Sequence, residues 1–149
     1  MNMSNAARAI IIEGDKMLVM HRNKHGSQYF TLVGGAAEEG ETPEQTLVRE
    51  VKEETGFVVT KSQFVFYEDH SAPYNQQYIF LCDLAPHDKT ITIQDGSDES
   101  QLNRLGANTH TPMWVDVKAF GTLAFRTPQL QDAIIRGIKK GFPTEAIRL

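Results

Sequence analysis

Short runs of apolar residues, some alternating with polar ones, occupy the first third of the chain. This spacing predicts strands over residues 6–12, 16–21 and 29–33, and the turn Glu13-Gly14-Asp15 joins the first two. The same signals later in the chain predict four more strands, at residues 58–67, 76–84, 90–93 and 113–117. The polar residues 95–109 before the last strand are expected to form a loop.

A first helix is predicted by signals at both of its ends. Thr42 is a suitable N-cap, Pro43 fits the first helical position, and Gln45 completes a capping box with Thr42. Gly56 is expected to end this helix after Thr55, because glycine readily adopts the left-handed conformation found there.

A second helix is predicted later in the sequence. Thr127 and Pro128 mark its start, and Gly141 and Pro143 mark its end. Its apolar residues recur at helical spacing and form one face that can pack on a sheet, namely Leu130, Ala133, Ile134 and Ile138. Strands interspersed with two helices indicate an α/β fold with a mixed sheet flanked by helices, and 149 residues fit a single domain over 1–149.

Composition narrows the class of protein. The chain is 40% hydrophobic and 23% charged and has no apolar run near the roughly 18 residues that span a bilayer, so we expect a soluble globular protein without a membrane partner. The single Cys82 cannot form an internal disulfide, and residues 1–12 lack the pattern of a signal peptide. We therefore expect a cytoplasmic protein with Cys82 in its core.

The acidic charge is concentrated in one stretch. The net charge of −4 argues against bulk electrostatic binding to nucleic acid, so no nucleic-acid partner is expected. Residues 38–54 contain seven acids and two bases, which leaves the rest of the chain at +1. The acidity is thus a local feature of the first predicted helix and of the loop before it.

Three acidic residues share one face of that helix. Glu50, Glu53 and Glu54 fall within an arc of about 100°. Taken alone, such acids ordinarily form a solvated surface. Repulsion within each like-charged pair costs about 0.2 to 0.5 kcal/mol, so we expect a positive charge nearby that offsets it. Arg49 can orient Glu53, and a hard dication such as Mg²⁺ can bind between the carboxylates. The acids are expected beside an apolar face formed by Leu47, Val48 and Val51.

A pair of glycines, Gly34 and Gly35, directly follows the predicted strand at 29–33. Paired glycines allow the backbone to approach a ligand closely, and they also occur in ordinary turns. The loop at residues 32–41 connects this pair to the acidic helix. The two features together predict a ligand site better than either feature alone.

These residues together match the signature G-x5-E-x7-R-E-U-x-E-E-x-G-U, where U is a bulky apolar residue. The matching positions are Gly35, Glu41, Arg49, Glu50, Val51, Glu53, Glu54, Gly56 and Phe57. This set resembles the Nudix box of MutT-like Nudix hydrolases and covers 23 of the 149 residues. The order of the flanking strands and of the final helix is also similar to that family.

The resemblance implies a Nudix-type α/β/α sandwich and a pyrophosphohydrolase that depends on Mg²⁺ or Mn²⁺. The implied metal ligands are the carboxylates of Glu50, Glu53 and Glu54 and the carbonyl of Gly35. Gly34 and Gly35 are expected to contact substrate, while Arg49 and Glu41 brace the box. Bound metal would neutralise the diphosphate and align water for in-line attack on phosphorus.

The chain departs from the family pattern at two positions, where Phe30 and Val33 replace the usual Trp and Pro before the glycines. A downstream acid often completes such a site, and Glu99 is the first candidate with Asp98 as the second; a solvated loop is the alternative. The general base is left open among Glu50, Glu53 and Glu99.

Arg22 and Lys24 lie in a basic cluster near the box and are candidates to pair with phosphate, although an ordinary solvated turn would look the same. The five histidines, His110 included, show no shared metal spacing. At most one aromatic residue is expected to stack on a base, from the set Phe30, Tyr74, Tyr78 and Trp114.

The expected substrate is a small nucleotide-type diphosphate, in which a nucleoside diphosphate is linked to another moiety. A nucleoside triphosphate, a nucleotide sugar such as ADP-ribose and a dinucleoside polyphosphate all remain open, because Pro73 fits one subgroup marker and Tyr74 another. The alternative function is a catalytically silent Nudix-fold module that binds a nucleotide as a sensor. A homodimer is left open as well.

Overall fold

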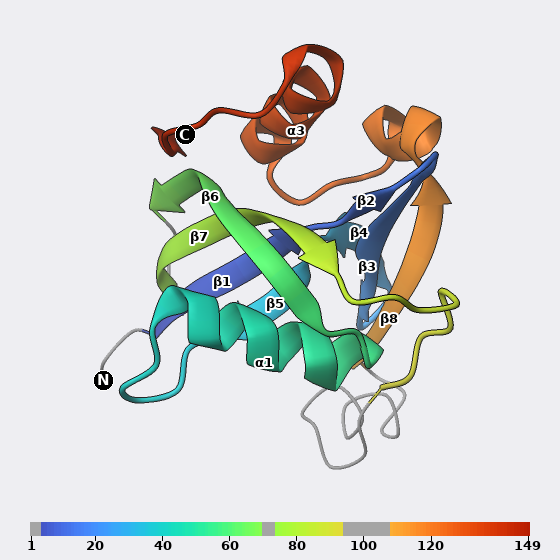
Figure 1. The fold of residues 1–149 in the computed structure, drawn as a ribbon. Helices are drawn as coiled ribbons and strands as arrows, with labels where there is room; N and C mark the ends of the chain where they lie inside the picture. Colours follow the sequence, from blue (N-terminus) through green and yellow to red (C-terminus); the bar gives the residue numbers. More distant parts are fainter. Residues whose placement is uncertain (1–3, 70–73, 94–107) are drawn as a thin grey trace.

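The computed structural model describes residues 4–69, 74–93 and 108–149. Two β-sheets lie between two helices, α1 (Pro43–Thr55) and α3 (Pro128–Lys140), which are on opposite sides of the sheets (Figure 1). The expected α/β architecture with a mixed sheet flanked by helices is confirmed. No helix in these three ranges combines the length and the apolar character needed to cross a bilayer.

The larger sheet has the strand order β5-β1-β7-β6-β9 and is mixed. β1 (Ser4–Ile10) runs antiparallel to β5 (Val33–Ala36) and parallel to β7 (Tyr74–Leu84). β7 runs antiparallel to β6 (Val59–Asp69), on which β9 (Ile147–Arg148) forms a short parallel pairing. The glycine pair therefore lies in β5 at an edge of this sheet, held by β1.

The second sheet is antiparallel and is organised around β3 (Lys16–Lys24). This strand pairs with β2 (Ile12–Glu13), β4 (Ser27–Thr31) and β8 (Asn108–Asp116). The expected turn joins β2 to β3, where Glu13 pairs with Lys16. A 3-10 helix, η1 (Val117–Thr122), follows β8.

Two of the predicted strands are each divided between the two sheets. The run at residues 6–12 begins in β1 of the larger sheet and ends in β2 of the second sheet. The run at residues 29–33 breaks at Leu32, between β4 and β5. The apolar pattern does not show these breaks, because the residues on both sides of each break are mostly apolar and nothing local marks the change of sheet.

The strand predicted at residues 90–93 is wrong, because these residues have no regular structure. Thr92 donates its backbone N–H to the carbonyl of Thr55 at 2.9 Å, so the segment closes the end of α1 instead of joining a sheet. The strand predicted at 113–117 is the second half of β8, and Val117 already belongs to η1. Residues 94–107, most of the predicted loop, lie outside the described ranges.

Both predicted helices have the predicted limits. The Thr42 hydroxyl accepts the backbone N–H of Gln45, and the Gln45 side chain accepts that of Thr42, which completes the capping box. Gly56 ends α1 in the left-handed region with φ of 81°, and its N–H donates to the carbonyl of Lys52 at 2.9 Å. α3 begins with Pro128 after Thr127 and is followed by Gly141.

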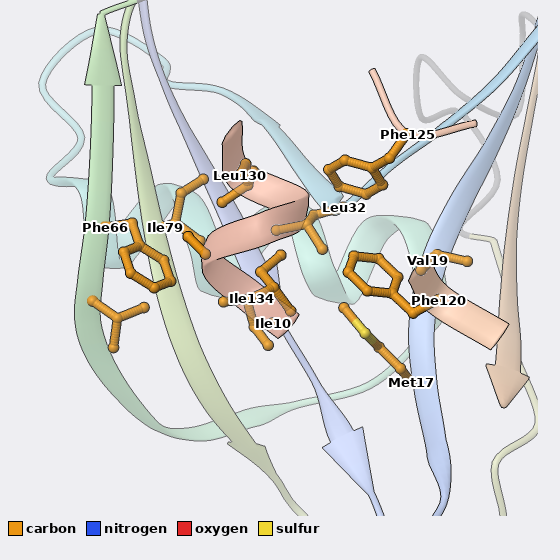
Figure 2. Close-up of a cluster of buried hydrophobic side chains, with 12 residues drawn as sticks. Ile10, Met17, Val19, Leu32, Phe66, Ile79, Phe120, Phe125, Leu130 and Ile134 are labelled. Carbon is orange, nitrogen blue, oxygen red and sulfur yellow. The ribbon is translucent and has the colours of Figure 1, made fainter. Parts of the chain in front are cut away.

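Alternate side chains of the central strands pack into two apolar cores. One core lies under α3 and includes Ile10, Met17, Val19, Leu32, Ile79, Phe120, Leu130 and Ile134 (Figure 2). The other lies under α1 and includes Ala9, Leu18, Phe80, Cys82, Leu47 and Val51. Cys82 is in the core as expected, whereas Val48 is 40% exposed and does not belong to the apolar face of α1.

Candidate active site

The acidic helix α1 packs against β5 and β1, with Leu47 and Val51 buried in the core below it. Glu50 and Glu54 are next to this apolar face on the helix, so their side chains are turned toward β5. Both are buried, and Glu54 is only 1% exposed. The two carboxylates therefore lie at the junction of helix and sheet and not in open solvent.

Glu54 connects α1 to β5 directly. Its Oε1 accepts the backbone N–H of Gly34 at 2.8 Å. A buried carboxylate is costly unless it is hydrogen-bonded, and this N–H provides one such bond. Glu54 thus stabilises the approach of the helix to the glycine pair in addition to the metal role implied for it.

The carboxylate of Glu50 lies on the backbone of Gly35. A Cβ placed on Gly35 would come 2.7 Å from the carboxyl carbon of Glu50, so any side chain here would displace that group. Gly34 is constrained differently, because its φ is 139° and a Cβ would lie 2.0 Å from the carbonyl oxygen of Ala7. One glycine makes room for a carboxylate and the other for strand β1.

Arg49 provides the positive charge between the acids. Its Nε and Nη2 donate to the two oxygens of Glu41 at 2.7 and 2.9 Å. Its Nη1 donates to Glu50 at 2.9 Å and to Glu53 at 3.3 Å, and Nη2 also donates to the carbonyl of Ala36 at 3.0 Å. The hydrogen bond from Arg49 is the main reason why the pKa of Glu41 is lowered to about 2.

A cleft of about 360 Å³ opens over these groups. Gly34, Gly35, Glu50 and Glu54 line it from β5 and α1. Further lining side chains come from β1, β3 and β8, and they include Arg8, Arg22 and His110. The cleft therefore lies where both sheets meet α1, and it combines carboxylates with guanidinium groups.

Arg8 donates hydrogen bonds to a side-chain amide and to two backbone carbonyls beside the cleft. Its Nε donates to Oε1 of Gln77 at 2.9 Å, and its Nη1 donates to the carbonyl oxygens of Gly34 at 3.0 Å and Leu32 at 3.3 Å. The bond to Gly34 joins β1 to the same backbone that Glu54 binds. Arg8 is thereby oriented toward the glycine pair.

His110 is neutral at physiological pH. Burial, together with the nearby charges of Arg22 and Arg8, lowers the pKa of its imidazole to about 4. A neutral imidazole adds no repulsion to the two guanidinium groups beside it. The cationic character of this part of the cleft thus comes from the arginines.

The carboxylates do not by themselves form a complete metal cage. Among the described residues, no group of three or more His, Cys, Asp or Glu side chains is arranged to hold a metal ion. Glu53 has a side chain 28% exposed and is held by Arg49, whereas Glu50 and Glu54 line the cleft. This donor set still fits Mg²⁺ or Mn²⁺, because Mg²⁺ commonly takes one or two carboxylates and completes its coordination with water and substrate phosphates.

A family model described as the NUDIX domain matches residues 3–136. The chain belongs to the Nudix family. The family assignment agrees with the signature that includes Glu50, Glu53 and Glu54, which lies entirely inside the matched range. Nudix hydrolases generally use divalent metal ions, consistent with the oxygen donors of this box.

The Nudix chain is similar to proteins named as hydrolases of different kinds. It is 33% identical over 78 residues to the NAD-capped RNA hydrolase NudC of Pectobacterium atrosepticum, a match that covers 52% of this chain and 30% of the relative. The chain thus spans about a third of the length of such relatives. A MutT structure from work on Aliivibrio salmonicida and Vibrio cholerae superposes with a TM-score of 0.64 at 21% identity, over 92% of this chain and 97% of that one.

An ADP-ribose pyrophosphatase of Streptococcus suis has the same fold. It superposes with a TM-score of 0.65 at 18% identity and covers 99% of this chain and 100% of that chain. At this level of identity the likeness shows the fold alone. The expected Nudix-type sandwich is therefore confirmed for this chain.

Several candidate residues from the sequence lie away from the cleft or outside the described ranges. Arg22 lines the cleft, whereas Lys24 is exposed near the end of the β3–β4 hairpin. Trp114 stacks on His87 with ring centres 5.9 Å apart and is not among the cleft residues. Phe30 and Tyr78 are also not among the residues that line the cleft. The candidates outside the described part are Pro73, Asp98, Glu99 and the side chain of Tyr74.

Sequence reasoning missed Arg8 and gave no role to His110. Both lie on strands that contribute no motif. Arg8 reaches the cleft through the pairing of β1 with β5, and His110 through the pairing of β8 with β3. One signal was available for Arg8: it is the only charged residue within the apolar run at 6–12. A charge inside a buried strand is uncommon without a partner or a function.

Proposed function

We propose that this Nudix protein is a divalent-metal-dependent pyrophosphohydrolase that cleaves a phosphoric anhydride in a nucleoside diphosphate linked to another moiety. The observation that carries the proposal is the cleft in which Glu50 and Glu54 lie beside Arg8 and Arg22. Carboxylates attract a dication, and guanidinium groups bind phosphate oxygens in a fork. A cleft with both kinds of group suits a diphosphate that arrives with its metal.

The box residues have distinct roles in this proposal. The metal, Mg²⁺ or Mn²⁺, would be held by Glu50, Glu53, Glu54 and the carbonyl of Gly35. When bound, it supplies charge neutralisation of the diphosphate and favours attack by water on phosphorus. Arg22 and the backbone at Gly34 and Gly35 would orient the phosphates.

Arg49 would act on the reaction by positioning carboxylates. Its bonds to Glu50 and Glu53 fix these two side chains relative to each other, and its bonds to Glu41 fix Arg49 itself. Proton removal from the attacking water needs a carboxylate close to it. The candidate bases are Glu50, Glu53 and Glu99, and separate Gln variants with pH–rate profiles would distinguish them.

The names of the relatives support this class of substrate. NAD-capped RNA hydrolases and an ADP-ribose pyrophosphatase both act on a nucleotide joined through phosphates to another group. Because one of these names includes RNA, the absence of a nucleic-acid partner stays a prediction. A cytoplasmic location and a homodimer also stay predictions.

The test is a panel of substrates with identification of the products. ADP-ribose, NADH, diadenosine polyphosphates and nucleoside triphosphates are incubated with Mg²⁺ or Mn²⁺, with and without EDTA. We expect hydrolysis of at least one substrate that EDTA abolishes, and a loss of about a hundredfold or more in kcat for Glu53→Gln. Glu44→Gln is the matched control, because Glu44 is an exposed acid in the first turn of the same helix.

Two results would contradict the proposal. One is full activity of Glu53→Gln and Glu50→Gln. The other is tight binding of a nucleotide without turnover of any substrate at saturating metal, which would instead support the sensor module. Product identity would also show which phosphorus is attacked.

A further inference from the structure

A row of side chains leads out of the cleft across the second sheet. Arg22 on β3 is paired in register with His110 on β8 and with Tyr29 on β4, so the three side chains lie on one face of the sheet. The Arg22 guanidinium lies 5.6 Å from the centre of the Tyr29 ring. Arg126 lies 5.5 Å from the same centre, and its Nη1 donates to the Tyr29 hydroxyl at 3.4 Å. The row therefore connects the cleft to Arg126.

The backbone fixes Arg126 beside this row. Phe30 donates its N–H to the carbonyl of Ala124 at 2.9 Å, and Arg126 donates its N–H to the carbonyl of Phe30 at 3.0 Å. The segment before α3 is thus paired with β4 as a strand would be. The position of Arg126 next to Tyr29 is a property of the fold and not of one flexible side chain.

Two hollows follow the same row. A small one of about 50 Å³ shares Arg8, Arg22 and Thr31 with the cleft and adds Arg126. A wider one of about 400 Å³ is lined by Lys24, Tyr29, Ala124, Phe125 and Arg126. Shared residues connect the cleft to the wider hollow, and we call the four cations along this route, Arg8, Arg22, Arg126 and Lys24, the arginine path.

Among the described residues, local acids do not neutralise the outer end of the arginine path. Residues 16–37 and 117–131, which supply three of its cations, contain no Asp or Glu. Within the described ranges, neither Arg126 nor Lys24 forms an ion pair with a carboxylate. An anionic group in the wider hollow would therefore meet two cations within a short range, where salt screens them least.

We propose that the arginine path binds substrate phosphates that lie outside the cleaved anhydride. The proposal rests on the proposed function and narrows its substrates to molecules with further phosphates, in a longer polyphosphate chain or in the phosphodiesters of an oligonucleotide. The planar fork of Arg matches phosphate oxygens, and Lys24 adds a point charge. A substrate that ends in a neutral sugar gains nothing from these cations.

The test compares kcat/KM for diadenosine diphosphate and diadenosine tetraphosphate, which differ only in the number of phosphates. The variant Arg126→Gln with Lys24→Gln removes the outer charges of the path, and Arg136→Gln with Lys139→Gln removes the same charges from exposed positions on α3. We expect the wild type to prefer the tetraphosphate and the first variant to lose about tenfold of that preference, mainly through KM, as expected for charge-assisted contacts. The α3 control variant should keep the full preference for the tetraphosphate.

A second arm uses an oligonucleotide capped with a 5′-diphosphate-linked nucleoside. If the first variant loses efficiency only with the capped oligonucleotide, the phosphodiesters are the ligand. If it loses efficiency only with the tetraphosphate, the polyphosphate chain is the ligand. Equal preference in the wild type and the first variant, or an equal loss in the α3 control, overturns the proposal. Thermal melting of both double variants verifies that they fold.

Equilibrium binding separates this proposal from the proposed function. The same two diadenosine compounds are titrated into wild type and into the first variant in EDTA, where no metal-dependent turnover can occur. Tighter binding of the tetraphosphate that disappears in the variant supports the arginine path even if no substrate is hydrolysed. Equal affinity of the wild type for the two compounds counts against the path even if hydrolysis is efficient.

Discussion

Gly34 and Gly35 are adjacent, and yet different neighbours constrain them. Gly34 has φ of 139°, and a Cβ would overlap the carbonyl oxygen of Ala7 at 2.0 Å, which is backbone and cannot move away. A Cβ on Gly35 would instead lie 2.7 Å from the carboxyl carbon of Glu50, which is the end of a side chain and can move. The first position is therefore constrained by the sheet, and the second by the site.

Alanine at the two positions should separate stability from activity. We predict that Gly34→Ala lowers the free energy of unfolding by about 2 to 4 kcal/mol, because strain at positive φ and the overlap with β1 add. Gly35→Ala should keep most of the stability and lower kcat, because it displaces Glu50. Urea unfolding and steady-state kinetics measure both effects. Equal losses of stability, or a fully active Gly35→Ala, would contradict this account.

Cys82 should be chemically silent in the folded protein. It is buried, and burial raises the pKa of its thiol to about 12, so almost no thiolate exists at neutral pH. We predict that the thiol reagent DTNB does not react with the native chain and titrates one thiol after unfolding in urea. Rapid labelling of the native protein would show that β7 opens far more readily than its buried position indicates.

The residues of the box could be predicted, because spacing along a helix determines which side chains share a face. Glu50 and Glu54 indeed face the same cleft. Arg8 and His110 could not be predicted in the same way. Arg8 reaches the cleft on β1 of one sheet and His110 on β8 of the other, and no local pattern records which strands become neighbours of these two.

At the scale of elements, Arg49 joins α1 to the loop that precedes it. Its two bonds to Glu41 hold the loop against the first turns of the helix. Because the pKa of Glu41 in the folded state is about 2, below its ordinary 4.5, Glu41 contributes stability above pH 4.5 that is lost as the pH falls toward 2. The contribution comes mainly from the hydrogen bond with Arg49.

This linkage predicts a specific change in acid sensitivity. The wild type should lose part of its unfolding free energy between pH 4.5 and 2, and Glu41→Gln should lose less over the same interval, since Gln does not titrate. Arg49→Gln should have a similar effect, because it removes the partner. Urea midpoints at several pH values give the comparison. An unchanged slope in both variants would mean that the ion pair contributes little in solution.

Helices could be predicted more accurately than strands for a physical reason. The ends of α1 depend on local chemistry at Thr42, Gln45 and Gly56, which the sequence states directly. The division of one apolar run between two sheets at Leu32 depends on which strand lies beside each half. Phe30 before the break and Val33 after it are both apolar, so the sequence alone does not mark the change of sheet.

At the scale of the whole molecule, the two sheets and α1 meet at one place. β5 contributes the glycine backbone, α1 contributes carboxylates, and β1, β3 and β8 contribute Arg8, Arg22 and His110. Apart from Arg49 of α1, which is hydrogen-bonded to carboxylates, the described cations that line the cleft come from the strands. The fold thus brings together an acidic helix and basic strands, as required for a metal and a diphosphate that bind as a pair.

Binding of a dication together with a diphosphate is the central claim, and electron paramagnetic resonance of Mn²⁺ tests it most directly. Free Mn²⁺ is titrated with the protein in the presence and absence of the non-hydrolysable diphosphate α,β-methylene-ADP, using wild type and Glu50→Gln. Because the carboxylates form only part of a metal cage, we predict that the analogue strengthens Mn²⁺ binding by about tenfold or more and that Glu50→Gln removes most of this gain. An Mn²⁺ affinity that neither the analogue nor Glu50→Gln changes would contradict the account.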